Sequence, residues 1–266
     1  MRKFLTPTRE TWLHRANPAA KLGIILGLFL LTLFTHSLDF IVYQAIVIYL
    51  VLFLMSGHPP WKILILILPL LFVFVSSSIT MVLFGKGDTL WWKWGIIRIS
   101  EESFYRGIHI GFKSITFAAE GLLYVLTTSS VALFYALMQK VKLAPKYAYS
   151  FMASVRLLPM VWEEFQIRRN ALQIRGVRHA QGMRGWVEQT KLYAVPLLSQ
   201  SIRRAHRVAI AMESKAFHNS RRRTYYYSSV FTLYDLGLLI LLAIALAAAY
   251  SLSHLYPLFG ITDVRY

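Results

Sequence analysis

Two short segments of the chain share one pattern of residue types. Each starts with Ala, continues through three residues to a long cation, and ends in a small residue. The first copy comprises Ala171, Arg175 and Gly176, and the second comprises Ala211, Glu213, Lys215 and Ala216. A small residue one helical turn before a cation lets a partner surface approach, and the planar guanidinium of Arg binds a carboxylate through two hydrogen bonds. The pattern therefore predicts two docking contacts with a partner protein.

Further cations accompany both copies. Arg168, Ala171 and Arg175 follow one another at spacings of three and four, so they share one face of a helix. Gly176 would end that helix as its first non-helical residue. Before the second copy lie three more cations that belong to the same basic face: Arg203, Arg204 and Arg207. Basic helices of this kind also face anionic lipid headgroups; that alternative stays open, but the repeated pattern favours docking.

Catalysis has little support in the residue pattern. The sequence contains no His-Glu-x-x-His zinc site, no Gly-x-Ser-x-Gly elbow and no Walker A loop, and its four Asp are scattered. The absence of Cys removes disulfides, zinc-thiolate sites and thiol catalysis. We expect a non-enzymatic chain that binds no metal or cofactor, so that any ATP is hydrolysed by a partner. Turnover by the purified chain alone would favour a membrane enzyme instead.

Two other classes remain as alternatives. A self-contained secondary transporter would favour inverted repeats and broken spans, whereas the repeat seen here is basic. An electrostatic scaffold for lipid or nucleic acid would bind in proportion to its charge and would tolerate reversal of any single Arg. Docking would not tolerate reversal at Arg175, and we expect no nucleic acid partner.

Composition identifies an integral membrane protein. Hydrophobic residues make up 56% of the 266 residues, and the mean hydropathy is +0.50. Five apolar runs are each close to the ~20 residues that cross a bilayer. They lie at about 20–36, 39–56, 62–84, 107–126 and 231–252. The predicted fold is an all-α membrane protein with about five transmembrane helices and a cytoplasmic module of about three amphipathic helices.

Charge predicts the orientation of the chain. Between residues 139 and 228, seventeen cations face four acids, which accounts for +13 of the total +17. Positive segments between spans stay cytoplasmic, and so does the basic start, which we expect to be retained. Five crossings then place the C-terminus outside, together with a Trp-rich loop at 85–106 that suits the membrane interface. The predicted domains are 1–126, 127–228 and 229–266.

Three ionisable residues fall within or at the ends of the predicted spans: Lys113, Glu120 and Asp235. Groups at this depth are functional candidates, but helix packing or an interfacial position is the simpler interpretation.

The basic segment predicts its own helices. One covers about 131–141, and Pro159 and Pro196 suit the first turns of two new helices, since proline lacks an N–H that those positions do not need. In the last helix, an apolar stripe recurs at spacings of four and three and suits close approach of another helix. Its members are Leu198, Ile202, Ala205, Ala209, Met212 and Ala216.

The order of these motifs resembles a known family. Leu13–Lys21 precedes the first span, Arg156–Pro159 leads to the first copy, and Arg203–Ala205 leads to the second. Together they resemble the transmembrane T component (EcfT, or CbiQ-like) of energy-coupling factor transporters of the bacterial cell membrane. The resemblance implies that Arg175 and Lys215 each contact one of two ABC-type ATPase domains. It also implies a separate membrane-embedded S component that binds the substrate.

The second copy departs from the family pattern. Lys215 and Ala216 stand where the family has Arg and Gly, so the charge remains but the bidentate fork is lost. Ala216 is also less suited than Gly to a left-handed helix end. We expect two unequal ATPase contacts, made to two chains or to one fused protein.

The transported substrate is less well defined. The start Arg9–His14 is closest to members that serve thiamine or its hydroxymethylpyrimidine precursor, although it includes no substrate contact. Other vitamins and metal ions, among them cobalt, nickel, biotin, riboflavin and folate, stay open.

Overall fold

The computed structural model describes residues 7–85, 87, 89–94, 97–176, 182–217, 224–260 and 263–264. Within them the chain forms two compact units. The first, here called the membrane unit, consists of Met1–Ala136 and Ser229–Tyr266. The second, the basic unit, is Leu137–Ser228.

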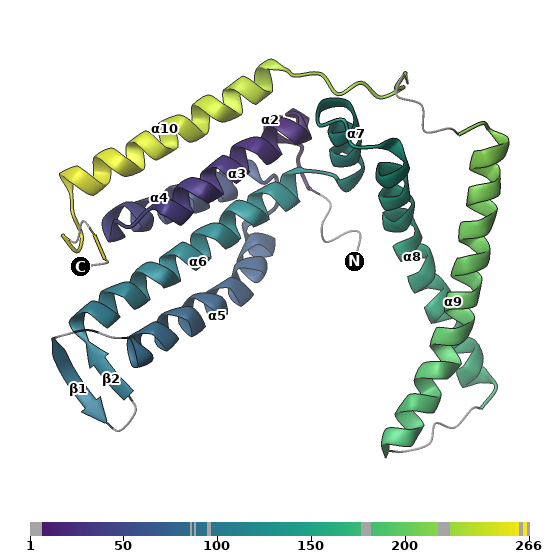
Figure 1. The fold of residues 1–266 in the computed structure, drawn as a ribbon, viewed down its shortest axis with the longest axis horizontal. Coiled ribbons are helices and arrows are strands. Elements are labelled where there is room, and N and C mark those ends of the chain that lie inside the picture. The colour runs from purple at the N-terminus through teal and green to yellow at the C-terminus, as the bar shows by residue number, and fades with distance from the viewer. Residues whose placement is uncertain are drawn as a thin grey trace. The chain divides into compact units, whose positions relative to one another are not determined.

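Apolar helices build the membrane unit (Figure 1). After the short α2 (Trp12–Arg15) follow α3 (Pro18–Phe34), α4 (Leu38–Met55), α5 (Pro60–Phe84), α6 (Glu101–Thr127) and α10 (Leu233–Leu255). Four of these, α4, α5, α6 and α10, are long and apolar enough to cross a membrane. The remaining predicted span, at about 20–36, corresponds to α3. This helix has 17 residues and so a length of about 26 Å, slightly below the ~30 Å thickness of the hydrocarbon core. The predicted all-α membrane fold is confirmed.

The core of the membrane unit forms where α4 and α6 meet α3 and α10. Its fully buried side chains include Ile48, Leu52, Ala119, Leu123, Leu238 and Leu242. Half of α4 is buried, because neighbouring helices surround it. Polar residues at the helix ends provide caps: Asn17 accepts from the N–H of Ala19 before α3, and Ser37 accepts from the N–H of Phe40 before α4.

Glycines bring α5 and α6 into close contact. A Cβ added at Gly107 would lie 2.4 Å from Cγ2 of Val82 and 2.9 Å from the carbonyl oxygen of Ser78. A Cβ at Gly111 would lie 2.0 Å from Oγ of Ser78. The Gly-x-x-x-Gly spacing thus places both glycines on the face of α6 that meets α5, as in other membrane helix pairs.

The predicted outer loop at 85–106 contains regular structure that the sequence argument missed. Strands β1 (Leu90–Trp94) and β2 (Ile97–Ser100) pair antiparallel. Helix α6 then starts at Glu101, earlier than the predicted 107, because Ser100 accepts a hydrogen bond from the N–H of Ser103 and two acids occupy the first turn. Trp91 and Trp92 are exposed on the hairpin.

Two long helices dominate the basic unit. Helix α7 (Ser130–Lys140) matches the predicted helix and leads to α8 (Pro145–Ile174) and α9 (Gly182–Ser214). The predicted helix starts at Pro159 and Pro196 are wrong, since both prolines lie inside these helices. Each helix loses one backbone hydrogen bond there. Contacts with α8 lie on both sides of Pro196, at Tyr193 before it and at Gln200 and Arg204 after it, and they favour continuation of α9.

Candidate partner-docking site at two helix ends

The first copy of the repeated pattern forms the end of α8. Arg175 is the C-cap residue, and its N–H donates to the carbonyl of Ala171 at 3.1 Å. Gly176 has φ +67° and donates its N–H to the carbonyl of Gln173 at 3.1 Å. An added Cβ at Gly176 would meet nothing within 4 Å. Its role is therefore conformational, and the predicted helix end is confirmed.

The second copy ends α9 in the same way, without glycine. Ala216 adopts a left-handed φ of +53°, a conformation that costs a non-glycine residue about 1–2 kcal/mol. Two hydrogen bonds hold it there: Ala216 N–H to the carbonyl of Glu213 and Phe217 N–H to the carbonyl of Met212, both 2.9 Å. This is the Schellman arrangement. The ring of Phe217 also packs edge-on against Tyr149 at 5.4 Å.

Both cations consequently occupy equivalent positions. Arg175 and Lys215 are each the first residue after the last helical residue, and both are exposed. The C-terminal end of a helix carries partial negative charge, which favours a cation there. Ala211 is exposed one turn before Lys215, Glu213 is exposed two residues before it, and Ala171 is half-buried one turn before Arg175.

The last turns of α8 and α9 lie at opposite ends of the α8–α9 pair (Figure 1). The contact between Tyr149 and Phe217 places the end of α9 beside the first turns of α8. Arg175 lies at the opposite end of α8, 26 residues after Tyr149, a helical distance of about 39 Å. One compact partner could not easily cover both positions, whereas two partners, or two domains of one, could each bind a single cation.

The remaining predicted basic residues divide into two groups. Arg203 and Arg207 are exposed and Arg168 is half-exposed, as expected for a basic face. Arg204 differs, because its guanidinium pairs with the carboxylate of Glu164 on α8. The sequence could not show this, since it depends on how α9 is rotated against α8.

The apolar stripe of α9 is not the surface that meets α8. Leu198 and Ile202 are 62% and 68% exposed. The half-buried positions Tyr193, Gln200 and Arg204 form the contacting face instead. The predicted close approach of a helix to the stripe is therefore not made by α8.

Comparison with known proteins identifies the family of the chain. The CbiQ family, described as cobalt transport protein, matches residues 9–226, which include both helix ends. The chain belongs to the CbiQ family. It is also 29% identical over 249 residues to the energy-coupling factor transporter transmembrane protein EcfT of Listeria innocua, covering 88% of this chain and 91% of that protein. The EcfT proteins of Lactococcus lactis and Brevibacillus brevis are 25% and 28% identical, over 82% and 85% of this chain and 84% and 88% of their own lengths.

Two ionisable groups on α6 of this CbiQ-family protein join it to neighbouring helices. Glu120 on α6 accepts hydrogen bonds from Thr32 of α3 at 3.0 Å and from Gln44 of α4 at 3.4 Å. The ammonium of Lys113 donates to the carbonyls of Leu33 and Thr35 at the end of α3, at 2.6 and 3.1 Å. These contacts support a packing role for Lys113 and Glu120.

A polar junction missed by the sequence argument holds the start of α3. Asp235 accepts from the N–H of Asn17 at 2.5 Å and from the N–H of Thr232 at 2.8 Å. Lys21, only 1% exposed, donates its ammonium to the carbonyl of Thr127 at 2.8 Å. The junction therefore ties α3 to the end of α6 and the start of α10.

The same junction also affects a neighbouring histidine. Burial and the nearby ammonium of Lys21 lower the pKa of His14. Asn17 and Lys21 belong to the sequence motif before the first span, and the Asn-Pro start of α3 was the available signal for a helix cap.

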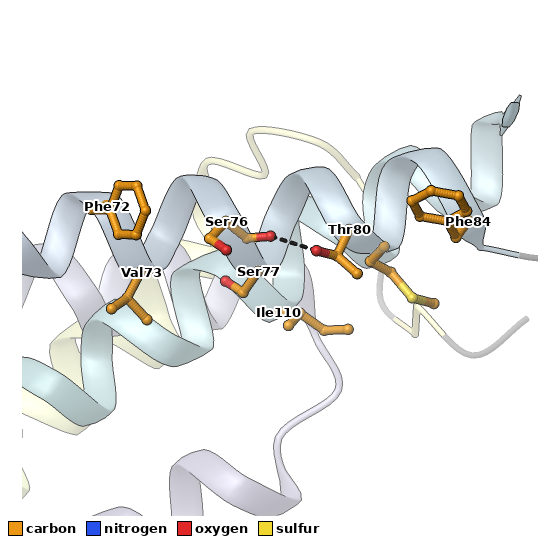
Figure 2. A pocket seen from close by; sticks show the side chains of 8 residues that line it. Phe72, Val73, Ser76, Ser77, Thr80, Phe84 and Ile110 are labelled. Carbon is orange, nitrogen blue, oxygen red and sulfur yellow. Dashed lines mark hydrogen bonds between the residues drawn. The ribbon is translucent and has the colours of Figure 1, made fainter. Parts of the chain in front are cut away.

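An open groove of about 620 Å³ runs along α5 (Figure 2). Its lining is apolar or hydroxylic: Phe72, Val73, Ser76, Ser77, Thr80, Met81, Phe84 and Ile110. The hydroxyl of Thr80 donates to the carbonyl of Ser76 at 2.8 Å, within the same helix. The lining has no ionisable group to select a charged substrate. Among the described residues, no group of three or more His, Asp or Glu side chains could hold a metal ion.

Proposed function

We propose that this CbiQ-family protein is the transmembrane coupling subunit of an energy-coupling factor importer. In this role it does not hydrolyse ATP or select the substrate; it transmits motion from two ABC-type ATPase domains to a separate S component in the membrane. The observation that carries the proposal is the pair of exposed cations, Arg175 and Lys215, at equivalent helix ends about 39 Å apart along α8. The names of the relatives, energy-coupling factor transporter transmembrane protein EcfT, support the same subunit class.

The two ATPase contacts are proposed to be unequal. Arg175 can hold a carboxylate with two parallel hydrogen bonds, whereas Lys215 acts as a point charge. The basic unit and the N-terminus would then both lie in the cytoplasm. The C-terminus would lie outside the cell. The substrate would be a vitamin or metal ion. Thiamine or its hydroxymethylpyrimidine precursor is the substrate suggested by Arg9–His14, and the family description names cobalt.

A pull-down of the ATPases by the full-length protein tests the docking contact. We expect Arg175→Glu to abolish ATPase binding, because a carboxylate would repel the acidic group that the guanidinium holds. Lys215→Arg should preserve or strengthen binding, since it supplies the missing fork.

The matched control is Arg169→Glu, which reverses another exposed cation on the same helix. It should leave ATPase binding nearly unchanged. If Arg169→Glu and Arg175→Glu weaken binding equally, the basic unit acts through its total charge, as an electrostatic scaffold would. Normal assembly and uptake by Arg175→Glu would exclude the contact.

A further inference from the structure

An ion pair lies where α8 and α9 contact each other. The guanidinium of Arg204 pairs with Oε1 of Glu164, and the side-chain amide of Gln200 donates to the same oxygen at 3.4 Å. The side chains of Glu164 and Arg204 are only 17% and 23% exposed. All three polar groups therefore meet at one partly buried point between the helices.

Aromatic rings pack between the helices beside this point. Phe165, adjacent to Glu164, packs against Tyr193 of α9 at 5.2 Å and stacks with Trp162 at 5.6 Å. Lower local polarity strengthens an ion pair compared with one at the open surface. The pair is thus placed to resist rotation of one helix about the other.

Much of the remaining surface of the two helices is uncovered. Leu158 and Ile167, on either side of the pair in α8, are 69% and 68% exposed. Arg175 lies 11 residues beyond Glu164, about 16 Å along the helix, so a rotation of about 10° at the contact would move it by about 3 Å. A shift of this size is about equal to the donor–acceptor distance of a hydrogen bond.

We propose that Glu164, Gln200 and Arg204 form a clamp that fixes the angle between α8 and α9, and with it the separation of Arg175 and Lys215. These are positioning residues, because none of them needs to touch the ATPases. The role of the clamp rests on the proposed function, in which Arg175 and Lys215 bind ATPases. The angle between α8 and α9 can nevertheless be measured in this chain without any partner.

The separation of the helix ends provides the direct test. Since the chain has no Cys, Asn170→Cys and Ser214→Cys, both at exposed positions, introduce the only thiols for spin labels. Electron–electron distances are then measured in the full chain in lipid nanodiscs, where one narrow distribution near about 30 Å is expected. In this background Glu164→Arg should shift or broaden the distribution by about 2 Å, because residue 170 lies six residues, about 9 Å, beyond Glu164. Adding Arg204→Glu restores the ion pair with its charges exchanged, so the original distance distribution should return.

Matched controls come from the adjacent positions. Glu163 and Arg203 are exposed neighbours of the clamp residues, so Glu163→Arg and Arg203→Glu should leave the distances unchanged. Glu164→Gln keeps the size of the side chain and removes its charge, and it should broaden the distribution even if Glu164→Arg does not fold. An unchanged distribution in Glu164→Gln, or no recovery in the exchanged pair, would overturn the clamp.

ATPase binding separates this inference from the proposed function. We expect Glu164→Arg to weaken ATPase binding by about tenfold and the exchanged pair to restore it. If Arg175→Glu binds ATPases normally, the proposed docking fails whatever the distances show. If Arg175→Glu abolishes ATPase binding while the Glu164 variants leave the spin-label distances unchanged, only the proposed clamp is wrong.

Discussion

At the scale of single residues, the two helix ends reach the same backbone conformation with different residues. Gly176 takes φ +67° with open space around it, and Ala216 takes φ +53°. The hydrogen bonds to Glu213 and Met212 stabilise this less favourable conformation. The strain at Ala216 is therefore local to the end of α9.

Exchanging these two residue types tests that strain. Ala216→Gly should stabilise the end of α9 by about 1 kcal/mol, because glycine adopts the left-handed region at no steric penalty. Hydrogen exchange at the amides of residues 216 and 217 should slow accordingly. The mirror substitution Gly176→Ala should destabilise the end of α8 by a similar amount. Faster exchange in Ala216→Gly would show that the alanine is not strained.

At the scale of helices and strands, close packing between α5 and α6 depends on glycine. The backbone of Ser78 and the side chain of Val82 fill the space where a side chain at Gly107 would lie. Gly121, on the same helix, has nothing within 4 Å of an added Cβ. One helix thus offers both a test position and a control.

Alanine substitutions at these two glycines should affect the stability of the membrane unit differently. We expect Gly107→Ala to destabilise the membrane unit by about 1–3 kcal/mol, since the backbone at Ser78 must move. Gly121→Ala should be neutral or slightly stabilising, because alanine favours a helix. Thermal unfolding in detergent measures both. Equal melting temperatures for the two variants would mean that α5 and α6 do not meet through Gly107.

At the scale of the whole molecule, orientation depends on whether α3 crosses the membrane. If all five apolar helices cross from a cytoplasmic N-terminus, the hairpin β1–β2 lies outside and the basic unit inside. If α3 does not cross, both assignments reverse. Thr32 of α3 is hydrogen-bonded to buried side chains of α4 and α6, which supports the interpretation that α3 crosses the membrane beside these helices.

Single cysteines in the Cys-free chain decide between these topologies. A maleimide that cannot cross membranes should label Thr89→Cys, beside the hairpin, in intact cells. It should reach Ser214→Cys, at the end of α9, only after the cells are opened. The reverse labelling would show that α3 does not span the bilayer.

Features that depend on local composition and spacing could be predicted from the amino-acid sequence alone. Apolar runs predicted the membrane helices, charge predicted a separate basic segment, and Gly176 predicted the end of α8. These features follow from interactions within a few residues, such as side-chain transfer to lipid and backbone conformational preference. The repeated pattern also located both candidate docking cations.

Which faces of the helices meet is visible only in the folded chain. Arg204 appeared to belong to the basic face but pairs with Glu164, forty residues away in the chain. Pro159 and Pro196 suited helix starts, yet both lie inside the long helices α8 and α9. The separation of Arg175 and Lys215 likewise depends on the antiparallel contact of Tyr149 with Phe217. Helix rotation and long-range packing arise from many distant residues together, so no local pattern encodes them.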